Sequence, residues 1–302
     1  CVNQGARFIG IFPENVRVVP SAERRMNCAK LREMIEGDQK RGLLPLVVCA
    51  SAGTTNTGVV DDLQEIAQIS RDANAWFHVD GAYGGFFSLT SEGRRLMKGM
   101  ELADSVVMDP HKGLCLPYGL GALLVRDQDM LHDSSVDGLD YLEPTAGEGV
   151  TDIIRQAPEL TRENRGLRLW LPLKMLGPQA FRENLQQKLE QARNAAAALH
   201  GSVANLCVVH APVLSVFTFK LADGRLSEAL DVLNLEFLHA INRRGNVLLT
   251  PLRSEVPGEF CIRMAILSHR TDEANIAQAV ADIRAAALEV QGFEPQDSQW
   301  GV

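Results

Sequence analysis

Short apolar runs alternate with amphipathic segments along the first two thirds of the chain. Strands are predicted at residues 45–49, 76–79, 105–108 and 121–125. Helices are predicted before and between them, at residues 30–41, from residue 61, and at residues 91–100. Consecutive strand–helix–strand units of this length imply a parallel sheet with right-handed crossovers, and the last strand is a candidate returning edge.

The start of the second helix is marked by polar residues. Asp61 is the expected N-cap, and Gln64 three positions later completes a capping-box pattern. Leu63, Ile66 and Ile69 then form one apolar helical face. This pattern predicts an amphipathic helix that covers the sheet.

The pattern changes after residue 127. Residues 128–159 are rich in Asp, Gly, Ser and Thr, and an irregular stretch of this length predicts a functional loop or a mobile segment. Helical spacing returns at residue 165, is interrupted by Gly177 and Pro178, and continues to a stop signal at Gly201.

The remaining residues predict a separate α+β lobe. Its strands are predicted at residues 214–221, 246–252 and 260–267, and its helices at residues 226–244 and 272–290. A chain of 302 residues exceeds one typical core. We therefore expect a large domain at residues 1–200 and a small C-terminal domain at residues 201–302.

Composition and charge narrow the class of protein. The chain is 46% hydrophobic and 23% charged, and its formal net charge of −8 argues against nucleic acid or an anionic membrane surface as a partner. Apolar runs such as residues 43–52 are well short of a membrane span. The six cysteines are scattered, without a C-x-x-C pair or metal-site spacing, so we expect reduced thiols, no metal and a cytoplasmic protein. Because the chain opens on Cys1 rather than Met, a processed product or a fragment is expected.

Two residues at consecutive strand ends carry the candidate chemistry. Asp80 follows the strand at residues 76–79, and Lys112 follows the strand at residues 105–108. Ligands of open parallel sheets bind at this edge. A lysine that forms a Schiff base and a carboxylate that keeps a pyridine nitrogen protonated are the contacts that pyridoxal phosphate requires. A turn-capping aspartate and a plain surface lysine are the open alternatives.

Three segments around these residues resemble a known family. Residues 50–58 (ASAGTTNTG), 78–85 (HVDGAYGG) and 109–113 (DPHKG) occur in the order found in group II pyridoxal-phosphate-dependent amino-acid decarboxylases. That family includes the aromatic-L-amino-acid, histidine and glutamate decarboxylases. The resemblance continues through residues 165–170 (RGLRLW) to residues 263–265 (RMA). It implies the α/β fold of type I pyridoxal-phosphate enzymes, with a mostly parallel sheet in the large domain and a smaller α+β domain.

The resemblance also implies roles for single residues. Lys112 resembles the Schiff-base lysine, and Asp80 resembles the partner of the pyridine nitrogen. Ala82 would pack under the cofactor ring, and Thr55 would line the cofactor pocket. His111 matches a histidine near the phosphate and the imine.

Other positions match less closely or depart from the family. Tyr141 matches a loop tyrosine that protonates the carbanion, although it could merely anchor the loop. Arg263 resembles an arginine near the substrate carboxylate, with a structural ion pair as the alternative. Asp109 stands where the family usually has a phosphate-contacting Asn, so we do not expect it to bind phosphate. Gly113 replaces a bulkier residue, and Thr161 stands where some relatives have a glycine at the dimer interface.

The implied function is decarboxylation of an L-amino acid to its amine and carbon dioxide by a homodimer. The family's ring-stacking histidine and phosphate loop precede the position of Cys1, so we expect the carboxyl-terminal portion of a longer enzyme. Alternatives are a related lyase, a decarboxylation-coupled aldehyde synthase, and a catalytically silent fragment with a structural or dimerisation role. Tyr141 favours simple decarboxylation, and the particular amino acid is left open.

Overall fold

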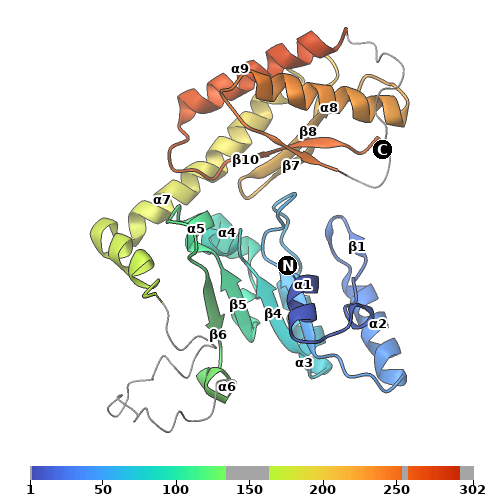
Figure 1. Ribbon diagram of the computed structural model, residues 1–302, viewed down its shortest axis with the longest axis vertical. Coiled ribbons are helices and arrows are strands. Elements are labelled where there is room, and N and C mark those ends of the chain that lie inside the picture. The colour runs from blue at the N-terminus through green and yellow to red at the C-terminus, as the bar shows by residue number, and fades with distance from the viewer. Residues whose placement is uncertain (1, 134–162, 254–257, 293–302) are drawn as a thin grey trace.

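The protein consists of two lobes joined by a long helix, α7 (Figure 1). This computed structural model describes residues 2–133, 163–253 and 258–292. The large lobe is built around strands β3 to β6, and the small lobe around strands β7 to β10. Helix α7, Leu167–Leu199, extends from the large lobe to the small one.

The large lobe contains a mixed, mostly parallel sheet. Its strands are β3 (Val47–Ser51), β4 (Trp76–Asp80), β5 (Ser105–Met108) and β6 (Ala122–Val125). They lie in the order β3-β4-β5-β6, with the first three parallel and β6 antiparallel to β5. The predicted parallel sheet and its returning edge strand are therefore confirmed.

Helices of the large lobe connect and cover these strands. The helices are α1 (Val2–Phe8), α2 (Cys28–Lys40), α3 (Leu63–Asp72), α4 (Ser91–Leu96), α5 (Pro110–Gly113) and α6 (Gln128–Asp133). Three 3-10 turns, η1 (Pro13–Asn15), η2 (Gly85–Leu89) and η3 (Met100–Leu102), and a short hairpin, β1 (Ser21–Ala22) with β2 (Arg25–Met26), complete the lobe. Helix α6 occupies the start of the stretch predicted to be irregular.

The predicted cap of α3 is wrong by one residue. Asp62, not Asp61, accepts the hydrogen bond from the backbone N–H of Glu65. The Asp61 carboxylate instead accepts hydrogen bonds from Met26 N at 2.7 Å and Ser51 N at 2.8 Å. An aspartate is a favourable N-cap, so both residues fit the sequence pattern. Because the Asp61 carboxylate binds Met26 N and Ser51 N, Asp62 is the residue that caps α3.

Helix α7 bends where the sequence predicts an interruption. Gly177 has φ 74° and ψ 156°, a left-handed backbone that favours glycine. Pro178 follows it and has no N–H to donate to the helix. The two halves of α7 therefore run in different directions, and the second half carries residues of both hydrophobic cores.

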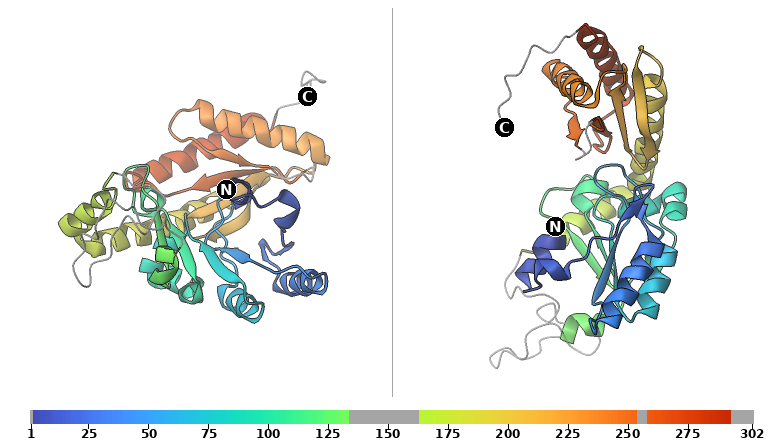
Figure 2. Two further views of the ribbon diagram at one scale, coloured as in Figure 1. Left: turned by 60° about the horizontal axis from the view of Figure 1, so that its bottom comes forward. Right: turned by 90° about the vertical axis from the view of Figure 1, so that its right-hand side faces the viewer.

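The small lobe pairs an antiparallel sheet with helices. Its strands are β7 (Leu206–Val213), β8 (Val216–Leu221), β9 (Thr250–Leu252) and β10 (Cys261–Ala265), in the order β7-β8-β10-β9. Helices α8 (Ser227–Arg243) and α9 (Glu273–Val290) lie on the side of the sheet away from the large lobe (Figure 2). Strand β7 was not predicted, because register shifts at Val208, His210 and Val213 break its alternation.

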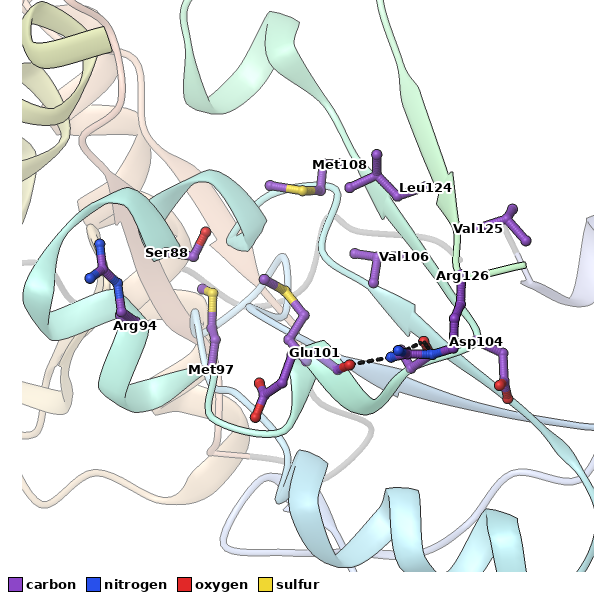
Figure 3. A pocket seen from close by; sticks show the side chains of 12 residues that line it. Ser88, Arg94, Met97, Glu101, Asp104, Val106, Met108, Leu124, Val125 and Arg126 are labelled. Carbon is purple, nitrogen blue, oxygen red and sulfur yellow. Dashed lines mark hydrogen bonds between the residues drawn. The ribbon is translucent and has the colours of Figure 1, made fainter. Parts of the chain in front are cut away.

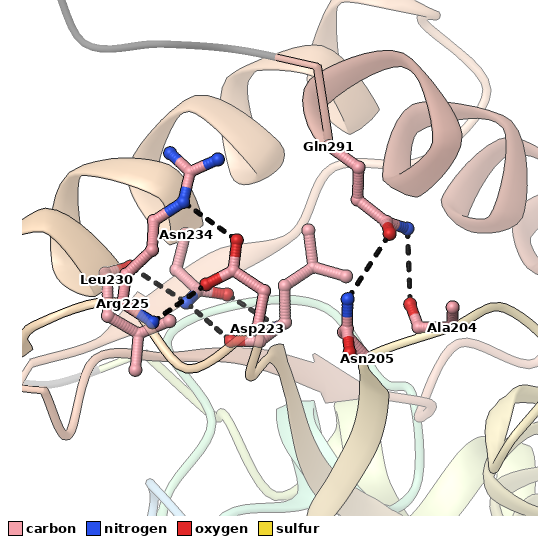
Figure 4. A network of polar contacts seen from close by, with 8 residues as sticks. Ala204, Asn205, Asp223, Arg225, Leu230, Asn234 and Gln291 are labelled. Carbon is pink, nitrogen blue, oxygen red and sulfur yellow. Dashed lines mark hydrogen bonds and ion pairs between the residues drawn. The ribbon is translucent and has the colours of Figure 1, made fainter.

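Side-chain amides connect segments of the small lobe (Figure 4). Asn234 of α8 is fully buried, and its side chain accepts from Leu221 N and donates to Leu221 O and Leu230 O. Gln291, just after α9, donates to Ala204 O at 3.1 Å. The lobe has its own hydrophobic cluster, separate from that of the large lobe. The domain division at residue 200 remains a prediction.

Candidate active site

The candidate site lies where the parallel strands end. Asp80 closes β4, and the pairing of β4 with β5 places it beside Val107. Beyond that point the two segments stay together, since Asp109 N donates to Ala82 O at 3.2 Å. Lys112 follows Val107 by five residues, on α5 at the same end of the sheet. The backbone therefore brings the segments of both predicted cofactor contacts to one edge.

The Asp80 carboxylate keeps an open hydrogen-bonding position. Its Oδ1 accepts a hydrogen bond from Ala82 N at 3.1 Å, while Oδ2 has no hydrogen-bond donor among the residues that the structure describes. Asp80 is half-buried. Burial, with Asp80 and Asp61 as further causes, raises the pKa of the neighbouring Cys49 thiol to about 11. The carboxylate thus lies beside a neutral thiol and can accept a further N–H donor.

His78, two residues before Asp80, belongs to a polar chain beneath the site. Trp76 Nε1 donates to Ser105 Oγ at 2.8 Å, and Ser105 Oγ lies 2.8 Å from His78 Nδ1. Burial lowers the pKa of His78, and the negative charge of Asp80 opposes this only in part. A neutral His78 can accept the hydrogen of the serine hydroxyl, which completes the chain.

Lys112 and His111 share one carboxylate on α5. Lys112 Nζ lies 2.8 Å from Asp109 Oδ2, and His111 Nε2 lies 3.8 Å from the same oxygen. His111 Nδ1 donates to Leu120 O at 2.8 Å, because a carbonyl can only accept. The ring of Tyr118 lies 5.5 Å from that of His111. These contacts orient the imidazole and hold the lysine beside an acid.

Two contacts connect the small lobe to this edge. Arg263 Nε of β10 donates to Thr55 O at 2.7 Å. Tyr83 OH accepts from Ser215 N at 3.1 Å and lies 2.8 Å from Ser215 Oγ. Burial raises the pKa of Tyr83 to about 12 and lowers the pKa of Arg263, although the nearby Tyr83 opposes the latter. Arg263 and Thr55, 208 residues apart in the sequence, are therefore in direct contact.

The departure at Gly113 has a steric explanation. A Cβ atom at this position would lie 2.7 Å from Phe86 Cβ. The Phe86 side chain of η2 thus occupies the space that a larger residue after the lysine would need. Glycine is required here by the close approach of η2 to α5.

Two features of the site were not predicted from the sequence, and two predicted residues lie outside the described part of the chain. The ion pair of Asp109 with Lys112 was not foreseen, although the i,i+3 spacing was a usable signal. Tyr118, an exposed aromatic residue six positions after the lysine, was also missed. Tyr141 and Thr161 lie outside the described residues.

A separate cavity of about 410 Å³ lies between α4, η3, β5 and β6 (Figure 3). Its apolar walls include Met97, Val106 and Leu124, and Arg126 at its rim donates to Glu101 O. None of the predicted site residues lines this cavity. Among the residues with a described position, no group of three or more His, Cys, Asp or Glu side chains could hold a metal ion.

Comparison with known proteins identifies the family. Residues 1–222 match the pyridoxal-dependent decarboxylase conserved domain. The chain belongs to the pyridoxal-dependent decarboxylase family. This match confirms the predicted family and, at the level of the family, the predicted pyridoxal phosphate cofactor.

Individual members of the pyridoxal-dependent decarboxylase family cover nearly the whole chain. The aromatic-L-amino-acid decarboxylase of Bacillus atrophaeus is 31% identical over 96% of this chain and 61% of its own length. The phenylacetaldehyde synthase of Arabidopsis thaliana is 28% identical over 92% of this chain and 57% of its own length. A crystal structure of Oryza sativa TDC with PLP and tryptamine has a TM-score of 0.88 at 27% identity, over 95% of this chain and 60% of that one. The predicted fold is thus confirmed, and the chain spans about 60% of the length of such relatives.

The residues of the candidate site fit the cofactor. Asp80 Oδ2 accepts no hydrogen bond from the described residues and can accept a pyridinium N–H, and Ala82, two residues later, has a small, half-buried side chain. The side chain of Lys112 is 41% exposed, so its amine is within reach of an aldehyde. Whether the carboxylate and the amine meet the two ends of one ring remains a prediction.

Proposed function

We propose that the protein is part of an enzyme that decarboxylates an L-amino acid to its amine with pyridoxal phosphate. The observation that carries this proposal is the position of two residues at one sheet edge, within a chain of the decarboxylase family. Asp80 ends β4, and Lys112 lies on α5, which follows the neighbouring parallel strand β5. Bound pyridoxal phosphate would supply an electron-withdrawing ring. This ring would accept the electrons of the bond between the substrate Cα and its carboxylate when carbon dioxide leaves.

Each residue has a proposed part in this reaction. Asp80 holds a proton on the ring nitrogen, and Lys112 holds the cofactor covalently until the substrate amine replaces it. Ala82 packs against the ring, and His111, fixed by Leu120 O, lies beside the lysine. These residues bind and orient the reacting groups, which stabilises the transition state by position and charge.

Arg263 is proposed to bind the substrate, and Thr55, whose backbone holds it, is proposed to line the cofactor pocket. The Arg263 Nε–H is used by Thr55 O, and the other guanidinium N–H groups make no hydrogen bond among the described residues. They can therefore bind a carboxylate, which matches the proposed role of Arg263 toward the substrate. Tyr141, outside the described residues, is proposed to return the proton after carbon dioxide leaves.

A test of the central proposal is covalent trapping. The full-length protein is incubated with pyridoxal phosphate, reduced with borohydride and digested, and the labelled peptide is located by mass spectrometry. We expect a pyridoxyl group on Lys112, and no label in Lys112→Arg. Lys30→Arg is the matched control, because Lys30 is half-exposed and also pairs with an acid three residues away. An unlabelled Lys112 in the wild-type protein would favour a silent structural unit instead.

Aldehyde synthesis is a second candidate, favoured by the similarity to the Arabidopsis phenylacetaldehyde synthase. It is tested by assaying amine, aldehyde and peroxide together, from a panel of aromatic, acidic and sulfur-containing amino acids. We expect amine from the wild-type protein and a rise in aldehyde and peroxide in Tyr141→Phe. Aldehyde as the main wild-type product would reverse the order of the two candidates.

We also propose that the enzyme is a homodimer in the cytoplasm. The first half of α7 exposes between 50% and 74% of the side chains of Leu167, Trp170, Leu171, Met175 and Leu176. An apolar stripe of this kind suits burial against a second copy. The five cysteines of the described residues carry free thiols, which suits a reducing compartment. None of the helices in the described part of the chain has the length and apolar content needed to cross a membrane.

Sedimentation tests the dimer. Trp170→Asp places a charge in the exposed stripe, and we expect it to shift the protein toward monomer. Arg193→Asp, on the second half of α7, is the control, because its partner Glu92 belongs to the same chain. A wild-type monomer at micromolar concentration would contradict the proposal.

A further inference from the structure

Asp109 stands at a helix start but does not cap the helix. It is the N-cap residue of α5, yet its side chain makes no capping hydrogen bond. An aspartate at this position ordinarily accepts from a backbone N–H of the first turn. Here the carboxylate is directed at Lys112 Nζ, 2.8 Å from Oδ2, and only 16% of the side chain is exposed. The Asp109 carboxylate therefore forms an ion pair with Lys112 in place of a capping hydrogen bond.

No other described acid pairs with Lys112. Asp109 is its one ion-pair partner within the described residues. The other titratable groups with a described contact at α5 are His111 on the helix, Cys115 just after it, Tyr118 against the His111 ring, and Lys188 of α7 near Cys115. η2, which packs against α5, consists of Gly, Phe, Ser and Leu and carries no charge. Asp109 is therefore the acid that holds the amine of the lysine within the described part of the chain.

We propose that Asp109 is a positioning residue that keeps Lys112 an ammonium ion until the cofactor binds, and thereby makes cofactor attachment depend on proton release. This inference rests on the proposed function, because it concerns the same lysine. Beyond that function, Asp109 would regulate how readily the cofactor is attached. The ion pair also explains how an acid is accommodated where phosphate binding is not expected.

The chemistry of attachment gives Asp109 its effect. When a primary amine joins an aldehyde, nitrogen supplies the electron pair of the new bond, a C=N bond forms, and the aldehyde oxygen leaves as water with two protons from the nitrogen. An ammonium ion has no free electron pair and must first release a third proton to solvent. A carboxylate at 2.8 Å stabilises the ammonium form and so slows this step.

The experiment measures attachment, not turnover. Cofactor-free full-length protein is mixed with pyridoxal phosphate over a pH series, and the rate of the imine absorbance change is recorded, with borohydride labelling of Lys112 as a second readout. We expect Asp109→Asn, which removes the ion pair of the lysine, to attach the cofactor roughly 5-fold faster near neutral pH. Asp109→Glu keeps the charge and is expected to stay close to the wild-type profile.

Asp38→Asn is the matched control. The side chain of Asp38, on α2, is 19% exposed and pairs with Arg41 three residues later and with Arg17, so the variant makes the same chemical change at another acid held by cations. We expect its attachment profile to equal that of the wild type. Circular dichroism establishes folding, and Asp109→Ser replaces Asp109→Asn if the latter does not fold.

The possible results separate this inference from the proposed function. If the wild-type Lys112 is labelled but Asp109→Asn attaches the cofactor no faster than the wild type, Asp109 does not control the lysine and the inference is wrong. If Asp109→Glu accelerates attachment as Asp109→Asn does, the effect is steric and the inference is also wrong. A wild-type protein with no label on Lys112 at any pH would remove the proposed function, and the inference with it.

Discussion

The two four-stranded sheets of the described residues differ in the direction of their strands. In the large lobe, β3, β4 and β5 run parallel, so their carboxyl ends meet at one edge. In the small lobe all strand pairs are antiparallel, so the carboxyl ends of neighbouring strands lie at opposite edges of the sheet. Of the candidate site residues with described positions, only Arg263 comes from the antiparallel sheet. Thr55, Asp80, Ala82, His111 and Lys112 all follow strands of the parallel one.

Polar side chains also differ between the two sheets, because some at the parallel edge keep free hydrogen-bonding positions whereas Asn234 in the small lobe does not. At the parallel edge, Asp80 Oδ2 has no hydrogen-bond donor among the described residues, and Lys112 remains partly exposed. In the small lobe, the polar atoms of Asn234 are buried and fully used. Open polar groups serve ligands, whereas satisfied ones hold the fold together. Substitutions in the two sheets should therefore affect different properties.

The strongest test of the comparison is Asp80→Asn. An amide cannot keep the ring nitrogen protonated, so we expect turnover to fall by about 100-fold or more, with little change in stability. Asp104→Asn is the control: Asp104 lies at the other end of the same sheet and accepts from Phe77 N at 2.7 Å, which an amide oxygen can also do. Steady-state assays that find equal turnover in the two variants would end the assignment of function to the carboxyl edge.

The second test moves to the small lobe. Asn234→Ala removes three hydrogen bonds and leaves buried backbone groups of Leu221 without partners, so we expect a loss of about 2–3 kcal/mol in the free energy of unfolding. Turnover per folded molecule should be unchanged. Gln291→Ala, at a helical backbone position in the same network (Figure 4), removes only exposed hydrogen bonds and should cost less than about 1 kcal/mol. Urea unfolding gives both values, and equal losses would contradict the distinction.

The same contrast decides how far the sequence could predict the fold. The parallel strands were predicted because buried strands are short apolar runs bounded by polar helices. Strand β7 was missed because its register shifts break the alternation that marks a half-buried strand. The cap of α3 was displaced by one residue, since two adjacent acids fit the pattern and only the tertiary contacts of Asp61 distinguish them.

The candidate site shows a similar limit. Lys112 and Asp80 could be named because each lies in a motif at a strand end. The contact of Arg263 with Thr55 joins residues 208 apart and depends on how the lobes pack, for which a local pattern holds no signal. The pairing of Asp109 with Lys112 depends on a side-chain rotamer, which the i,i+3 spacing allows but does not require.

A third test concerns the packing beneath the parallel edge. Gly113→Ala would place a Cβ 2.7 Å from Phe86 Cβ, and we expect a loss of about 1–2 kcal/mol in the free energy of unfolding. Phe86→Gly removes the clashing Cβ, so adding Gly113→Ala to a Phe86→Gly background should cost less stability than adding it to the wild type. Gly37→Ala, inside α2 with nothing within 4 Å, should instead stabilise by about 0.5–1 kcal/mol. Thermal unfolding that shows both alanines to be stabilising would remove the steric explanation for Gly113.

The smallest expected effect compares one histidine from each sheet. Burial lowers the pKa of His78 on β4, and burial followed by Arg24 lowers the pKa of His210 on β7, while Asp80 and Glu259 respectively oppose these shifts. The unfolded chain, with an ordinary histidine pKa of 6.5, then binds protons more readily than the folded protein. The stabilisation is therefore complete above about pH 6.5 and is lost as the pH falls toward the lower folded-state values.

Urea midpoints at about pH 7.5 and about pH 5.5 measure this loss. We expect His78→Gln and His210→Gln each to lose less stability than the wild type between the two pH values. The exposed His200→Gln should behave as the wild type does. If only His78→Gln reduces the loss of stability between the two pH values, the loss at low pH arises from the parallel sheet alone. The polar chain from Trp76 through Ser105 would then be the part of the fold that proton uptake breaks first.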